Sequence, residues 1–409
     1  MGVFSVPSFH GEWFWSDWIT AKDSDVVDFV ASTEAPSFAY ADYAPRLTYE
    51  LFNSSAWAEL IALSGAKYVV PTTKHHEGFA MWPSAQNYMW NSLQVGPKRD
   101  VYGEIVDAVR ARPEGIKVGA YHSLFEWYNP LFLEDQANNF TTRLFVDGKT
   151  LPELYDLILT YKPDLVWSDG DWVASDLYWN ATGFLAWLAN ESPVKDTVVW
   201  NDRWGGNSLC HHGSYYTCSD RYLPSTLVGH KWENAFTIDT VSWGYRRNAP
   251  LSDYLTTAQV IAQVIQTVAL GGNALINIGP ARDGTIDPIF SDRLTGLGAW
   301  LAVNGDAIYA TTPWRAQNDT AVSAWYTSKA SSVYAIVTSW PKGGTLALVA
   351  PIGVVGTSTA TLLGDGNPLA WTPTNAPGSP GIRVQLPPLD FSSPLASATA
   401  WTVELRGFS

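Results

Sequence analysis

The chain has 409 residues, with 39 acidic against 25 basic side chains, a formal net charge of −14 and 46% hydrophobic residues. This apolar fraction excludes an intrinsically disordered protein, and the negative charge repels nucleic-acid phosphates and anionic membrane surfaces. No apolar run approaches the ~20 residues that span a bilayer. We therefore expect a soluble protein without nucleic-acid or membrane partners.

The first residues, Met1 to Val6, show neither the basic nor the apolar region of a signal peptide. Asn-x-Ser/Thr sequons are typical of secreted glycoproteins but also arise by chance, and they begin at Asn53, Asn139, Asn180, Asn190 and Asn318. Aromatic residues make up 14% of the chain, with 21 tryptophans. Such a content suits either the stacking of sugar rings or a large aromatic core.

From about residue 56 to 309, short apolar runs alternate with segments of helical period, the pattern of β/α units around a parallel sheet. The expected strands are 67–71, 117–122, 165–168, 197–200, 228–232, 274–278 and 307–310. The expected helices are 55–64, 101–110, 152–161, 186–190, 254–269 and 290–303. This order predicts a (β/α)8-type barrel that lacks one strand, with its reactive residues just after the strands.

Two cysteines, Cys210 and Cys218, lie close enough in sequence to close a small disulfide loop, although a reduced pair would have the same spacing. His211 and His212 stand between them, but adjacent side chains diverge and no second ligand pair follows at zinc spacing. We therefore expect no metal site here.

After Pro313 the pattern changes to short alternating runs separated by Gly, Pro and Asn, at 332–338, 345–349, 381–386 and 400–405. This pattern predicts a small antiparallel β-sandwich. The expected domains are a catalytic barrel over residues 1–313 and a C-terminal β-sandwich over residues 314–409.

Carboxylates, histidines and tryptophans follow the expected strands in KHHEGF (74–79), YHSLFEW (121–127), WSDGDW (167–172), NDRW (201–204) and KWEN (231–234). Glycoside hydrolysis needs two carboxylates beside a pocket that positions the sugar. The strand ends therefore indicate a glycosidase. NIGPARDG at 277–284 is glycine-rich but lacks the signature of a phosphate-binding loop.

The chain resembles the α-L-fucosidases of glycoside hydrolase family 29. The resemblance rests on GEWFW (11–15), GAKYVVPTTKHHEGFAMWPS (65–84), GAYHSLFEWYNP (119–130), DLVWSDGDW (164–172), SWGYRRN (242–248) and GGNALINIGPARDGTI (271–286). It implies a retaining exo-glycosidase that hydrolyses terminal α-L-fucosyl residues of oligosaccharides, glycoconjugates or xyloglucan. No cofactor is implied.

By this resemblance Asp169 is the nucleophile. Asp171, two residues further in what we expect to be an extended segment, should face elsewhere as a surface or loop residue. The acid/base is either Glu233, expected just after a strand, or Asp220, on the loop that follows the cysteine pair. The sequence favours neither candidate.

The resemblance also implies a set of substrate-binding residues: Glu12, Trp13, His75, His76, Tyr121, Trp167, Arg203 and Trp243. Arg203 has the alternative of a structural ion pair, and Trp243 that of a core residue. Neutral imidazoles at His75 and His76 can both donate to and accept from sugar hydroxyls.

Family members have a first barrel strand ending in His-Trp-Gly, whereas this chain has Met1 in place of that tryptophan. We therefore expect a chain truncated at its N-terminus, derived from an extracellular or lysosome-like protein. Two alternatives remain open. One is a carbohydrate-binding protein without turnover, and the other is a different barrel exo-glycosidase such as a galactosidase.

Overall fold

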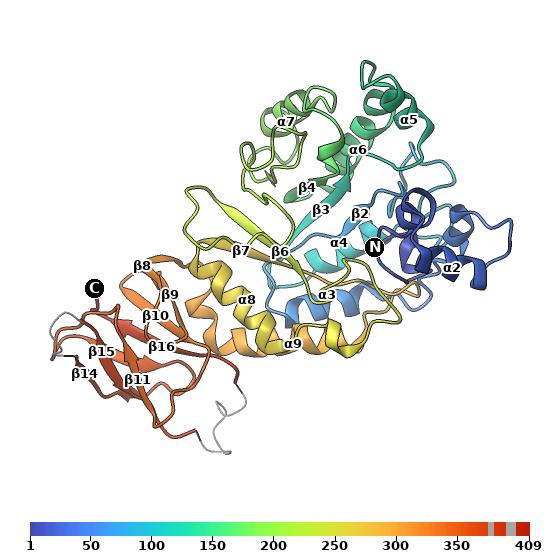
Figure 1. Ribbon diagram of the computed structural model, residues 1–409. Coiled ribbons are helices and arrows are strands. Elements are labelled where there is room, and N and C mark those ends of the chain that lie inside the picture. Colours follow the sequence, from blue (N-terminus) through green and yellow to red (C-terminus); the bar gives the residue numbers. More distant parts are fainter. Residues whose placement is uncertain (375–379, 390–397) are drawn as a thin grey trace. The chain divides into compact units, whose positions relative to one another are not determined.

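The computed structural model describes residues 1–374, 380–389 and 398–409 (Figure 1). The chain divides into two compact units. The first comprises Met1–Asp220, Thr237–Tyr254 and Ile276–Ser291, and the second comprises Arg221–Phe236, Leu255–Leu275 and Asp292–Ser409. None of the helices among these residues has the length and apolar composition needed to cross a membrane.

A parallel sheet forms the centre of the first unit. Its strands are β1 (Tyr68–Val69), β2 (Thr72–Lys74), β3 (Lys117–Ser123), β4 (Leu165–Asp169) and β5 (Val199–Trp200). β1 and β2 both pair with β3, β3 pairs with β4, and β4 pairs with β5. Every residue of β4 is buried, as expected for a strand covered on both faces. The carboxyl ends of these parallel strands meet at one edge of the sheet.

Helices precede β1 in the chain and separate β2, β3, β4 and β5 from one another. They are α1 (Phe14–Ser16), α2 (Ser24–Thr33), α3 (Ser54–Leu63), α4 (Val101–Arg110), α5 (Pro130–Ala137), α6 (Leu151–Tyr161) and α7 (Ala181–Asn190). Leu154 of α6 and Phe184 of α7 share a core with Val166 of β4, which places both helices against this strand (Figure 1). Side-chain caps define several helix starts, such as Asp100 Oδ1, which accepts from Gly103 N at 2.9 Å.

Two further strands, β6 (Trp232–Thr237) and β7 (Gly272–Asn277), pair with each other. They are followed by α8 (Thr257–Ala269) and α9 (Pro288–Asn304), respectively. Thr256 and Gln259 form a capping box at the start of α8.

The C-terminal part is an antiparallel β-sandwich. One sheet has the strand order β13-β12-β16-β10-β9-β8, and the other has the order β11-β15-β14. The bounds are β8 (Thr312–Asn318), β9 (Ala324–Lys329), β10 (Ser332–Val337), β11 (Thr345–Leu348), β12 (Thr359–Leu362), β13 (Pro368–Leu369), β14 (Trp371–Pro373), β15 (Ile382–Gln385) and β16 (Trp401–Arg406). Apolar side chains of both sheets, such as Ala335 and Val384, form a common core. The predicted sandwich strands are thereby confirmed.

Two sequence predictions of strands are wrong. The strand expected at 228–232 begins only at Trp232 and continues to Thr237. The strand expected at 307–310 is absent from this described segment, because Gly305–Ala307 form a 3-10 turn and the amides of Ile308 and Tyr309 both bond to Gly305 O. Residues 1–67 form helices and turns, so the first strand along the described chain is β1.

Candidate active site

Asp169 is the last residue of β4, at the edge where the carboxyl ends of the parallel strands meet. Its Oδ1 accepts a hydrogen bond from Arg203 at 2.9 Å, and its Oδ2 accepts one from the Tyr121 hydroxyl at 2.5 Å. His76 Nε2 lies 3.7 Å from the same Oδ2. The structure thus brings together four residues that the sequence analysis had selected.

The charge of Asp169 is stabilised by these neighbours. Burial alone raises the pKa of this carboxyl, but the Arg203 charge and the hydrogen bonds from Tyr121 and Arg203 outweigh burial and leave the pKa below its usual value. A carboxylate that is ionised, buried and held at both oxygens is suited to nucleophilic attack.

His75 and His76 follow β2 with their ring centroids 4.1 Å apart. Burial lowers the pKa of His75 to about 4 and holds the pKa of His76 well below its ordinary value. Both imidazoles are therefore neutral near pH 7. His76 Nδ1 is 2.6 Å from Ser123 Oγ, which fixes the orientation of its ring.

Aromatic rings surround the histidines and Asp169. Trp13, 36% exposed, lies edge-on to His76 at 5.4 Å and stacks on Trp172 at 6.2 Å. Trp127 contacts His75, His76 and Trp13. The sequence analysis did not assign Trp127 and Trp172 to the site, although both belong to the motifs that follow the strands.

Trp167 lies beneath the basic side chain of the site. The Arg203 guanidinium carbon is 4.6 Å from the centre of the Trp167 ring, which in turn stacks on Tyr121 at 5.4 Å. This cation–π contact fixes the plane of the guanidinium.

Arg203 also binds Asp220, one of the two acid/base candidates. Its second terminal nitrogen lies 2.7 Å from Asp220 Oδ1, and the Asp220 side chain is 49% exposed. One guanidinium therefore separates Asp169 from Asp220. Both carboxylates therefore contact the same guanidinium, which places them on one side chain of the site.

Glu233 lies elsewhere than expected. It is the second residue of β6 rather than a residue after a strand, and it is 2% exposed. It also belongs to the second compact unit, whereas Asp169 and Asp220 belong to the first. The preceding segment, with Pro224 and Gly229, forms bends and turns, so the strand starts later than its apolar residues suggested.

Asp171 also departs from expectation, because it is buried rather than a surface residue. Gly170 adopts a φ of 77°, and a Cβ there would lie 2.5 Å from the Phe125 ring, so the chain turns directly after Asp169. This turn directs Asp171 inward, where it is 3% exposed and burial raises its pKa to about 6.

Glu12 and Trp243 are brought together by a backbone anchor. Glu12 Oε2 accepts from Ser242 Oγ at 2.8 Å, from Trp243 N at 2.9 Å and from Gly244 N at 3.1 Å. Glu12 therefore holds the segment that carries Trp243. Its sequence neighbour Trp13, together with Trp127 and Trp172, forms the aromatic wall of the site.

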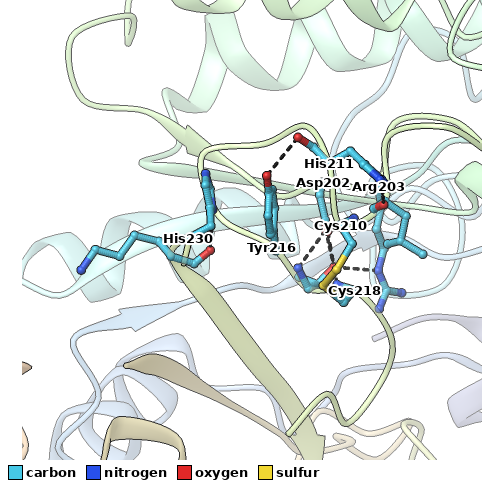
Figure 2. The surroundings of a disulfide bond; sticks show 10 residues. Asp202, Arg203, Cys210, His211, Tyr216, Cys218 and His230 are labelled. Atoms are coloured by element: carbon cyan, nitrogen blue, oxygen red, sulfur yellow. Dashed lines mark hydrogen bonds between the residues drawn. A yellow bond between two sulfur atoms is a disulfide. The ribbon is translucent and has the colours of Figure 1, made fainter. Parts of the chain in front are cut away.

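The Cys210–Cys218 disulfide is present, with the two Cα atoms 4.7 Å apart (Figure 2). Within the described ranges, one group of side chains has metal-ligand spacing, and it consists of Asp202 and these two cysteines, whose sulfurs are joined to each other. The neighbouring His211 directs its Nδ1 to Leu209 O at 2.7 Å.

Replacing Tyr121 with Phe should lower kcat/KM about 10- to 100-fold, because a hydrogen bond to a charged group contributes roughly 1.5–3 kcal/mol. Without this bond the pKa of Asp169 rises, so the acid limb of the pH–rate profile should move to higher pH. Tyr161→Phe is the matched control, since it removes a 2.7 Å phenol bond to Asp100 outside the site. Equal losses in both variants would refute a specific role for Tyr121.

Comparisons with known proteins agree with this geometry. The family model described as Alpha-L-fucosidase matches residues 1–306, and the Alpha-L-fucosidase C-terminal domain matches residues 317–406. The chain is 54% identical to an alpha-L-fucosidase of Branchiostoma floridae, over 99% of this chain and 90% of the relative. It is 50% identical to the human tissue alpha-L-fucosidase, over 99% of this chain and 86% of that protein.

Solved structures are similar as well. A crystal structure of a Thermotoga maritima alpha-fucosidase with a mechanism-based inhibitor has a TM-score of 0.81 at 28% identity, covering 99% of this chain and 93% of that one. A trapped covalent intermediate of a Bacteroides thetaiotaomicron alpha-L-fucosidase has a TM-score of 0.78 at 26% identity, covering 99% and 92%. The predicted fold class, a β/α-barrel type followed by an antiparallel β-sandwich, is confirmed.

Proposed function

We propose, from the premise that this chain belongs to the α-L-fucosidase family, that Asp169 is the nucleophile with which it hydrolyses terminal α-L-fucosyl residues. The observation that carries this assignment is the pair of bonds that hold Asp169, from Arg203 at 2.9 Å and from Tyr121 at 2.5 Å. Alpha-L-fucosidase names recur among relatives that match 99% of the chain, so neither a galactosidase nor a binding protein without turnover is favoured.

The proposed reaction has two steps. In the first, Asp169 attacks C1 of the fucosyl residue while Asp220 gives its proton to the departing glycosidic oxygen. In the second, Asp220 takes a proton from water, whose oxygen attacks C1 and releases Asp169 as a carboxylate. Asp169 is charged before the first step and Asp220 after it. Arg203, which binds both, thus has one carboxylate charge to balance at each stage.

Substrate binding is assigned to the neutral histidines and the aromatic wall. His75 and His76 can donate to and accept from sugar hydroxyls, and Trp13 offers a half-exposed face to an apolar side of the sugar. We assign fucosylated glycans as substrates: oligosaccharides, glycoconjugates or xyloglucan. Glu12 and Trp243 contribute by fixing the 242–244 segment.

Leaving-group dependence separates the two acid/base candidates. Asp220→Ala should lose hydrolysis of a natural fucoside by about 10²- to 10⁴-fold, yet keep forming the fucosyl-enzyme from an activated aryl fucoside, and azide should restore its turnover. Glu233→Ala should lower both activities together, since Glu233 is buried within β6. The opposite pattern would transfer the acid/base role to Glu233.

We also propose a division into a catalytic domain, residues 1–313, and a C-terminal domain, residues 314–409, supported by the family matches at 1–306 and 317–406. An extracellular or lysosome-like location is supported by the disulfide, which persists in oxidising compartments. Fractionation of the native source, with a mobility shift on deglycosylation of the protein, would test this location.

A further inference from the structure

The loop between Arg203 and Asp220 is fixed by hydrogen bonds to a buried carboxylate, that of Asp202. Asp202 is fully buried and accepts four hydrogen bonds. It lies beside the Cys210–Cys218 disulfide (Figure 2). Its Oδ2 accepts from Cys210 N at 2.7 Å and Cys218 N at 3.2 Å, and its Oδ1 accepts from the backbone N and hydroxyl of Thr217 at 2.9 and 2.6 Å. Asp202 therefore binds the backbone amides of both disulfide-bonded cysteines and two groups of Thr217, the residue directly before Cys218.

Thr217 links Asp202 to Arg203 through its hydroxyl group. A threonine hydroxyl has one proton to donate, and here that proton goes to Asp202. The same hydroxyl oxygen accepts from Arg203 Nε at 3.0 Å. Asp202 thus fixes the rotation of Thr217, and Thr217 fixes the third nitrogen of the guanidinium whose other two bind Asp169 and Asp220.

We propose that Asp202 and the Cys210–Cys218 disulfide together are a positioning device that sets Asp220 and Arg203 for proton transfer. This proposal rests on the assignment of Asp220 as acid/base. The Asp220 side chain is 49% exposed, so packing against other side chains contributes little to its position. The loop of residues 204–219 that precedes it must therefore fix where Asp220 lies. Asp202 touches neither Asp169 nor Asp220 through any bond described, and it acts through the loop.

The carboxylate is required because both of its oxygens accept. An asparagine has one carbonyl oxygen, which can accept, and one NH2 group, which can only donate. In Asp202→Asn the NH2 group would therefore face either the two cysteine amides or the backbone N and hydroxyl of Thr217. Asp202→Asn should therefore release either the two cysteine amides or Thr217, with almost no change in side-chain volume.

Asp135 provides a matched control in the same compact unit. It is also fully buried and accepts four bonds, from Thr142 Oγ1, Leu144 N, Phe145 N and Tyr178 Oη, but these partners do not contact Arg203. Asp135→Asn should therefore reproduce the stability loss of Asp202→Asn without its kinetic effect.

In the experiment, kcat/KM is measured on a natural fucoside and the fucosylation rate on an activated aryl fucoside. Asp202→Asn should lose about 100-fold in kcat/KM on the natural fucoside and less than about fivefold in the fucosylation rate on the aryl fucoside. Asp135→Asn should stay within about twofold on both. Equal losses on both substrates, or the same pattern in both variants, would overturn the proposal.

A second arm uses the wild-type chain and covers the case in which Asp202→Asn does not fold. The chain has two cysteines in total, so dithiothreitol has one target, and the double variant Cys210→Ser/Cys218→Ser serves as its control. Reduction should produce the same substrate-selective loss in the wild type and no change in the double variant. If the ratio of the rates on the natural and the aryl fucoside stays the same after full reduction, verified by thiol counting, the disulfide has no such role.

The Asp220→Ala variant distinguishes this inference from the assignment on which it rests. If Asp220→Ala lacks the leaving-group signature, the acid/base assignment has failed, and the positioning role fails with it. If Asp220→Ala shows that signature and Asp202→Asn does not, the acid/base assignment stands and only the positioning role is wrong.

Discussion

Asp169→Ala should abolish turnover of every fucoside, with kcat/KM reduced by at least about 10⁴-fold irrespective of the leaving group. The reason is that Asp169 supplies the bond to C1 in the first step, which a better leaving group cannot replace. Its two hydrogen-bond partners, Arg203 and Tyr121, remain in place around the vacated volume. Azide should enter that volume and convert an activated α-fucoside into the β-fucosyl azide, with inverted configuration.

Steady-state kinetics, product analysis by NMR and thermal unfolding would check this result. Asp135→Asn again serves as the control for folding, because it removes a buried carboxylate away from Arg203. Turnover by Asp169→Ala within about tenfold of the wild type, after purification from any contaminating enzyme, would show that Asp169 is not the nucleophile.

Arg203→Met should reduce kcat/KM by about 10³-fold. Arg203 is buried and contacts Asp169 at 2.9 Å and Asp220 at 2.7 Å, so its removal leaves the nucleophile without a countercharge. The control is Arg99→Met, since Arg99 also pairs with a carboxylate, that of Glu104, and lies over an aromatic ring, that of Phe52 at 5.0 Å. Arg99→Met should keep its activity within about twofold.

The pH dependence of Arg203→Met has a definite sign. Arg203 lowers the pKa of Asp169 against the effect of burial, so without it the pKa of this carboxyl rises. Attack needs the ionised carboxylate, and the acid limb of kcat/KM should therefore move to higher pH. An acid limb that stays in place, or moves to lower pH, would mean that Arg203 does not control the charge of Asp169.

Local sequence patterns predicted the end of a strand where the buried residues of that strand are apolar. Leu165–Trp167 is a buried apolar run, so the end of its strand, and with it Asp169, could be located from sequence. The strand Trp232–Thr237 could not, because it contains Glu233, Asn234 and Thr237. Their burial depends on partners elsewhere in the chain, such as Thr267 Oγ1, which accepts from Asn234 at 3.0 Å.

Individual site residues were missed where backbone geometry or a distant bond decides their role. Asp171 was expected to face outward from an extended segment, but the positive φ of Gly170 turns it inward. Asp202 is adjacent to the predicted Arg203, yet its function depends on amides that follow it by eight or more residues. Such contacts between a strand end and a later loop leave no periodic signal in the sequence.

Covalent trapping tests the central claim, attack by Asp169, most directly. The protein is incubated with 2-deoxy-2-fluoro-fucosyl fluoride, digested, and analysed by peptide mass spectrometry. We expect one fluorofucosyl group per chain, on the peptide that contains Asp169, and none in Asp169→Ala. A label on another carboxylate, or hydrolysis of the reagent with inversion and without any label, would contradict it.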